Sequence, residues 1–109
     1  LGSGSVTPLE LANGYAVFAN GGYLVSPYFI QRIENTDGDI VWQAEPAYAC
    51  SKCEAPASPT AKQVITPQNS YLMTSMMRDV VRFGTARRAM ELKRNDLAGK
   101  TGTTNDQFD

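Results

Sequence analysis

The chain has 109 residues, enough for one small domain with a modest core or for a piece of a larger domain. Its 10 basic and 11 acidic residues leave a formal net charge of −1, which excludes the positive field that attracts nucleic acids. No apolar run approaches the roughly 20 residues of a membrane span, so we expect no membrane contact from this segment. Histidine is absent, which excludes histidine-based triads and most metal sites within the chain, and we expect no metal and no cofactor.

The first predicted element is a helix that begins after Thr7. Thr7 can cap the free amides, Pro8 suits the first helical position, and Glu10 completes a T-x-x-E capping box. The sequence "NGG" at 20–22 predicts that the helix ends there, with a residue in the left-handed backbone conformation. Large apolar residues recur at i, i+4 and i+7 and predict a face that packs in the core, formed by Leu11, Tyr15 and Phe18.

A β-hairpin is predicted next, followed by a loop. Its arms lie near 28–34 and 40–43 and are rich in β-branched and aromatic residues on either side of the turn "NTDGD". Residues 44–62 are rich in Ala and Pro without periodicity, which predicts an exposed and mobile loop insertion. The loop holds the only two cysteines, Cys50 and Cys53, too few for a structural zinc site. They form either a small disulfide-closed loop or two free thiols.

A second helix has the same kind of start, with Thr66 as the cap and Pro67 in the first turn. Gly84 predicts its end, and Thr85 is expected to cap a short helix over 86–92. The apolar positions of the long helix predict one broad buried face made of Leu72, Met73, Met76, Met77, Val80 and Val81.

The stretch "DLAGKTGTTND", residues 96–106, raises the question of a phosphate site. A P-loop has the pattern G-x-x-x-x-G-K-[ST] between a buried strand and a helix. Gly99-Lys100-Thr101 matches its end, but the first glycine would stand at 94, where the chain has Arg94. The preceding "MELKRND" is a poor strand, and no helix start follows. The sequence therefore argues against a phosphate-binding loop.

An extended strand fits this stretch better. Thr101 and Thr103 then project to one side, while Lys100 and Gly102 have the opposite parity. An ammonium group, two hydroxyls and free strand amides suit an anionic, peptide-like ligand beside the strand, which Gly102 lets approach closely. An edge strand is an equally good interpretation, with a lysine that discourages aggregation and threonines that reflect β-propensity.

The motif K-T-G at 100–102 is also a signature of penicillin-binding proteins and class A β-lactamases. Here "DLAGKTGTTND" with the following Phe108-Asp109 resembles the same region of class A penicillin-binding proteins. Two upstream segments resemble that family in the expected order, namely "GSGSVTPLELANGYAVFANGGY" (2–23) and "ITPQNSYLMTSMMRDVV" followed by "GTARRA". The resemblance covers nearly the whole chain outside 44–62.

This resemblance implies an α+β fold, in which residues 1–109 are the C-terminal portion of a transpeptidase domain whose antiparallel sheet packs against helices. It implies that Lys100 supplies positive potential and takes part in a proton network. Thr101 and Thr103 would bind the terminal carboxylate of a peptidoglycan stem peptide or of a β-lactam. The Thr103 amide would be one oxyanion-hole donor, and Gly102 would leave room beside the acyl group.

The family also needs S-x-x-K, which carries the nucleophile and its activating lysine, and S-x-N. No serine of this chain begins either motif: Ser3, Ser5, Ser26, Ser51, Ser58, Ser70 and Ser75. Ser75 is followed three residues later by Arg78, but an arginine remains protonated and cannot act as a base. We therefore assign no nucleophile here and expect it in the remainder of the same domain, upstream of Leu1.

Two functions remain open at this stage. The first is a fragment of a bacterial cell-wall D,D-transpeptidase that works through a serine acyl-enzyme, at the periplasmic face of the inner membrane and anchored by a segment outside this chain. The second is a catalytically inactive ligand-binding or interaction module that keeps the fold. The chain starts on Leu1 and carries neither missing motif, so we expect an excerpt of a longer protein and favour the first function.

Overall fold

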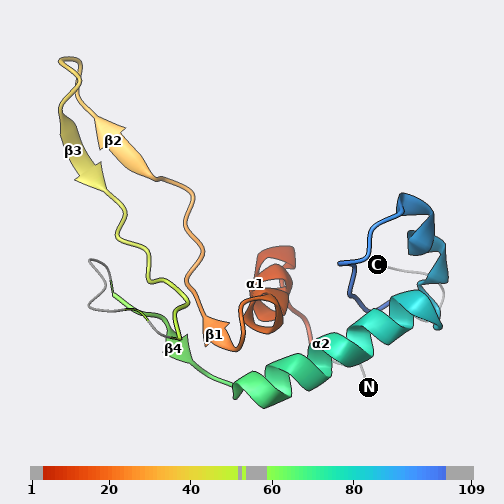
Figure 1. Ribbon diagram of the computed structural model, residues 1–109. Coiled ribbons are helices and arrows are strands. Elements are labelled where there is room, and N and C mark those ends of the chain that lie inside the picture. Colours follow the sequence, from red (N-terminus) through yellow and green to blue (C-terminus); the bar gives the residue numbers. More distant parts are fainter. Residues whose placement is uncertain (1–3, 52, 54–58, 103–109) are drawn as a thin grey trace.

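A computed structural model describes residues 4–51, 53 and 59–102, which contain two α-helices, a 3₁₀ helix and two small antiparallel sheets (Figure 1). This arrangement confirms the predicted α+β class. The strands pair as β1 with β4 and β2 with β3. In chain order the elements are α1 (Pro8–Ala19), β1 (Tyr23–Leu24), β2 (Arg32–Glu34), β3 (Ile40–Gln43), β4 (Lys62–Gln63), α2 (Pro67–Arg82) and η1 (Arg87–Leu92). Neither α-helix in this described part is long and apolar enough to cross a bilayer.

Helix α1 begins and ends as its sequence predicts. The Thr7 hydroxyl accepts from the Glu10 amide at 3.3 Å, and the Thr7 amide donates to Glu10 Oε2 at 2.7 Å, which completes the capping box. The Glu10 carboxylate accepts from the Thr7 amide and also, at 2.9 Å, from the Thr7 hydroxyl, and these two hydrogen bonds lower the pKa of Glu10, the backbone one most. After the helix, Gly21 and Gly22 adopt positive φ values of 84° and 103°. They turn the chain into β1.

The hairpin is confirmed, with a shorter first arm than predicted. Its strands pair Arg32 with Gln43 and Ile33 with Trp42, and an irregularity follows Ile33. The Asn35 side chain closes the turn by accepting from two backbone amides. A backbone bond from Ala44 to the Gln31 carbonyl is the last rung before Pro46, which has no amide to donate. Residues 28–31 therefore lie outside β2, and the hairpin projects away from both helices (Figure 1).

The loop at 44–62 is tied down at several points. Cys50 and Cys53 form a disulfide with a Cα–Cα distance of 5.9 Å, which decides between the two predicted states of these cysteines. The Tyr48 amide donates to the Pro59 carbonyl at 3.0 Å, and the Ala61 amide donates to the Tyr48 carbonyl at 2.9 Å. Ala61 is buried, and Lys62 already belongs to β4. The prediction of an exposed loop is therefore wrong at its C-terminal end, because the chain there returns to pair with β1. Residues 52 and 54–58 lie outside the described residues.

Helices α1 and α2 cross at a small contact with a polar centre. The Ser70 hydroxyl is buried and donates to the Phe18 carbonyl at 2.9 Å, and the Thr74 hydroxyl donates to the same carbonyl at 3.4 Å. This carbonyl is in the last turn of α1, where no intrahelical partner remains. Val17, next to Phe18, is buried, and so is Val81 in the last turn of α2.

The predicted apolar faces of both helices are largely open, and the prediction of a buried core is wrong for most of their members. Leu11, Leu72 and Met76 are each more than half exposed. The solvent-accessible surface is 9356 Å², against roughly 6,000 Å² expected for a compact monomer of this mass. The radius of gyration is 18.1 Å, against about 13 Å for a compact chain of this length. The sequence pattern marks an interior face, but the described elements supply no layer to cover it.

Candidate active-site segment

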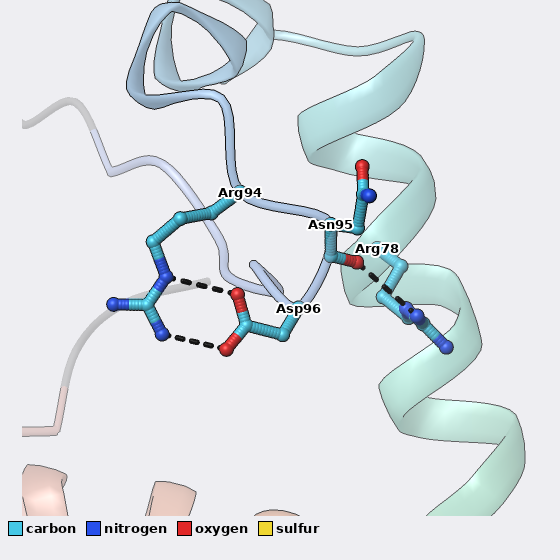
Figure 2. Close-up of polar contacts among 4 residues, drawn as sticks. All are labelled: Arg78, Arg94, Asn95 and Asp96. Carbon is cyan, nitrogen blue, oxygen red and sulfur yellow. Dashed lines mark hydrogen bonds and ion pairs between the residues drawn. The ribbon is translucent and has the colours of Figure 1, made fainter.

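The segment that leads to the K-T-G motif is attached to the second half of α2. After η1 the chain turns back, helped by Lys93, whose φ of 52° is left-handed. The Arg78 guanidinium donates to the Asn95 carbonyl at 3.2 Å, as Figure 2 shows. The Gly99 amide donates to the Met77 carbonyl at 3.2 Å. These two hydrogen bonds, one from a side chain and one between backbone groups, hold the residues just before Lys100 against α2.

The short helix predicted over 86–92 is present but differs in type and in its cap. It is the 3₁₀ helix η1, and Ala86 stands at its N-cap without a side-chain hydrogen bond. The prediction that Thr85 caps it is wrong. Ala86 instead donates its amide to the Val80 carbonyl, which ties the turn to the end of α2. The Thr85 hydroxyl is directed elsewhere, toward the K-T-G motif.

An ion pair stiffens the same segment. The Arg94 guanidinium binds the Asp96 carboxylate through two parallel hydrogen bonds of 2.9 and 2.6 Å (Figure 2). The Arg94 side-chain hydrogen bonds are the main cause that lowers the pKa of Asp96 to about 2 from its usual 3.8, and a hydrogen bond from its own backbone adds to this. A bidentate pair fixes the relative orientation of its partners, although solvent exposure limits its contribution to stability.

We expect a carboxyl-detected NMR titration of Asp96, in the complete transpeptidase domain, to give a pKa of about 2. Arg94→Gln should raise this pKa toward 3.8. Arg78→Gln should change it much less, because the positive charge of Arg78 is the smallest of the causes that lower the Asp96 pKa. Because the folded pKa is depressed, the pair stabilises the segment above the unfolded pKa and loses this effect as the pH falls through about 2. An Asp96 pKa that is the same in the Arg94→Gln variant would contradict the assignment.

Lys100 and Thr101 lie together on the surface. The Lys100 ammonium donates to the Thr101 carbonyl at 2.6 Å and to Thr101 Oγ1 at 3.4 Å, and both residues are exposed. The prediction of a strand with the two side chains on opposite faces is therefore wrong for residues 100–102. A strand needs a hydrogen-bonded neighbour, and within the described part of the chain the paired strands lie toward the other end of α2 (Figure 1).

The rest of the predicted site is divided between described and undescribed residues. Thr101 Oγ1 lies 2.5 Å from Thr85 Oγ1, a contact that joins the K-T-G motif to the turn after α2. Gly102 is exposed, and a Cβ there would meet no atom within 4 Å, so the backbone is open to approach. The predicted roles of Thr103 lie outside the described residues. Sequence reasoning missed Thr85 and Arg78 as supports, although both lie in segments that resemble the family.

Two apolar hollows lie beside this segment, where it faces α1 and α2. The first, of about 260 Å³, reaches the K-T-G motif itself and is lined by Tyr15, Phe18, Met73, Met76, Met77, Val80 and Lys100. The second, of about 330 Å³, lies next to the Arg94–Asp96 pair and is lined by Tyr15, Phe18, Ala19, Thr74, Met77, Asp96 and Ala98. The apolar faces predicted for both helices thus meet next to Lys100.

Residues 1–107 match the penicillin binding protein transpeptidase domain family, and the chain belongs to this family. It is similar to penicillin-binding protein 1A of Neisseria lactamica, with 50% identity over 109 residues, and to that of Pseudomonas aeruginosa, with 40% over 146. The crystal structure of penicillin-binding protein 1A from Haemophilus influenzae superposes with a TM-score of 0.83 at 34% identity, over 96% of this chain. The predicted resemblance to class A penicillin-binding proteins is confirmed.

The chain spans only a small part of each relative. It covers 13% of the Neisseria protein, 18% of the Pseudomonas protein and 19% of the Haemophilus structure, and the first two alignments include 100% of this chain. The open apolar faces of α1 and α2 agree with such a position inside a larger domain. The chain is therefore a fragment of a cell-wall transpeptidase domain.

Proposed function

We propose that residues 1–109 form the C-terminal portion of a class A transpeptidase domain, a serine-type D,D-transpeptidase that crosslinks peptidoglycan stem peptides through an acyl-enzyme and is acylated by β-lactams. The observation that carries the proposal is the exposed K-T-G motif, held on α2 by the Gly99–Met77 hydrogen bond, in a chain that matches the transpeptidase family over 1–107. The nucleophilic serine and its activating lysine belong to the remainder of the domain.

The described contacts suit the binding of a carboxylate. The Lys100 ammonium has three donors, of which its contacts to Thr101 use at most two, so a donor remains for a ligand. The adjacent Thr101 hydroxyl supplies a second donor at an exposed position. A hydrogen bond from a charged donor to a carboxylate is about twice as strong as one between neutral groups. Thr103 is proposed to add a hydroxyl and an oxyanion-hole amide, and Gly102 clearance for the acyl group.

The Cys50–Cys53 disulfide supports the proposed location at the periplasmic face of the inner membrane. Disulfides persist in oxidising compartments such as the bacterial periplasm and are rare in the cytosol. The membrane anchor is proposed to lie outside this chain. The partners are then a stem peptide or a β-lactam, together with the rest of the same domain.

The function is tested with the complete protein and a fluorescent penicillin. We expect one covalent adduct, which mass spectrometry of peptides maps to a serine outside residues 1–109. The isolated 109-residue chain should remain unlabelled, because acylation needs a nucleophile activated by a neighbouring base. Ser70 cannot replace it, since its buried hydroxyl donates to the Phe18 carbonyl.

Two outcomes would contradict the proposal. A folded complete protein that forms no adduct would favour the inactive ligand-binding or interaction module. An adduct on Ser70 or Ser75 would place the chemistry within this chain.

A further inference from the structure

We infer that Thr85 is a positioning residue for Thr101, which it turns so that the Thr101 hydroxyl proton faces the carboxylate of the ligand. This inference rests on the proposed function and adds a specificity-determining residue to it. It starts from one contact: Thr85 Oγ1 and Thr101 Oγ1 are 2.5 Å apart, although 16 positions separate the residues in the chain.

Counting donors and acceptors on Thr101 shows what each direction of this hydrogen bond means for a ligand. A hydroxyl has one proton and two lone pairs. The Lys100 ammonium, which can only donate, lies 3.4 Å from Thr101 Oγ1 and occupies one lone pair. If Thr85 donates to the second lone pair, the proton of Thr101 is free for a ligand. If Thr101 donates to Thr85 instead, it has no proton left for a ligand.

A carboxylate selects the first arrangement, because an ionised carboxylate only accepts hydrogen bonds. Thr85 then donates to Thr101 and Thr101 donates to the ligand, a chain in which each hydrogen bond polarises the next. The ammonium of Lys100 beside Thr101 makes the site prefer an anionic acceptor over a neutral one. We therefore expect Thr85 to contribute to acylation by substrates that carry a carboxylate, and much less to others.

Backbone hydrogen bonds attach the segments of both hydroxyls to the same helix, α2. Thr85 follows Gly84, whose amide donates to the Asp79 carbonyl at 3.1 Å, and precedes Ala86, whose amide donates to the Val80 carbonyl at 3.1 Å. A Cβ on Gly84 would lie 2.9 Å from the Val80 backbone, so this turn is packed closely against the end of α2. Thr101 comes two residues after Gly99, which is bonded to the same helix through Met77. Helix α2 thus sets the distance between the two hydroxyls.

The test compares Thr85 variants of the complete protein in acylation by benzylpenicillin and by its methyl ester, which lacks the negative charge. Thr85→Val keeps the shape of the side chain and removes its hydroxyl, while Thr85→Ser keeps the hydroxyl. We expect Thr85→Val to lower the second-order rate constant about tenfold for benzylpenicillin and less than about twofold for the ester. Thr85→Ser should stay within about twofold of the unmodified protein for both. Thr36→Val, in the exposed turn of the hairpin, is the matched control and should change neither rate.

The remaining outcomes overturn the inference. If the unmodified protein is acylated and Thr85→Val reacts with benzylpenicillin at the same rate, Thr85 has no positioning role. If Thr85→Val slows both compounds equally, with a lower melting temperature, its role is only structural. If the unmodified protein is not acylated at all, the proposed transpeptidase function fails as well. This outcome differs from a failure of the Thr85 inference alone, in which the unmodified protein is still acylated.

Discussion

Replacing Lys100 by alanine in the complete protein is expected to reduce the rate of acylation by a fluorescent penicillin by about a hundredfold or more. The ammonium lies within hydrogen-bond distance of two Thr101 oxygens and is exposed toward solvent. Its removal takes away both the positive potential for a carboxylate and a member of the proposed proton network. The second-order rate constant is measured by following the covalent adduct with time.

Two further variants make this result specific. Lys62→Ala, in β4 near the other end of α2, removes an exposed lysine remote from the motif and should leave the rate unchanged. Lys100→Arg keeps the charge but cannot release a proton, so it should restore carboxylate binding more than it restores the rate. A Lys100→Ala protein that reacts as fast as the unmodified one would remove Lys100 from the site.

Replacing Gly22 by alanine is expected to destabilise the complete domain by about 3 kcal/mol, because a non-glycine residue is strained at positive φ and also meets a steric clash. Gly22 has a φ of 103°, and a Cβ there would overlap the Ile65 carbonyl. Its own carbonyl accepts from the amides of Val64 and Ile65 at 2.8 and 3.3 Å. Gly22 thus joins the end of α1 to the start of α2, and the melting temperature measures the loss.

Gly21→Ala is the matched control for this prediction. Gly21 has a similar φ of 84°, but a Cβ there would meet no atom within 4 Å. Gly21→Ala should lower the free energy of unfolding by about 1 kcal/mol, because it adds the backbone strain of a positive φ but no steric clash. Equal melting temperatures for the two variants would show that the approach of Ile65 to Gly22 is not important for stability.

Features that depend on residues close in the chain were predicted well. The capping box of α1, the Thr66 cap of α2, the glycine turn after α1 and the hairpin around "NTDGD" all form where the sequence indicated. Each depends on hydrogen bonds or backbone angles within a few residues, so the local sequence is enough to specify it.

Features that depend on distant neighbours were predicted less well. The apolar periodicity of α1 and α2 predicts buried faces, yet most of their members are exposed, because periodicity says nothing about which element covers them. The strand expected over 100–102 failed for the same reason, since a strand exists only beside a partner with which it exchanges hydrogen bonds. The local sequence around Thr85 predicts a helix cap, whereas its hydroxyl contacts Thr101.

By itself, the sequence determined the family of this chain, the α+β class, the starts and ends of its two helices and the presence of the K-T-G motif at Lys100. Only the tertiary structure decided that Cys50 and Cys53 are joined, that Arg78 and Met77 hold the segment before the motif, and that Thr85 reaches Thr101. Such contacts need segments that the fold of α2 and η1 brings back together. Local sequence preferences cannot predict these contacts. Each one joins residues that are far apart in the chain and forms only when the fold brings them together.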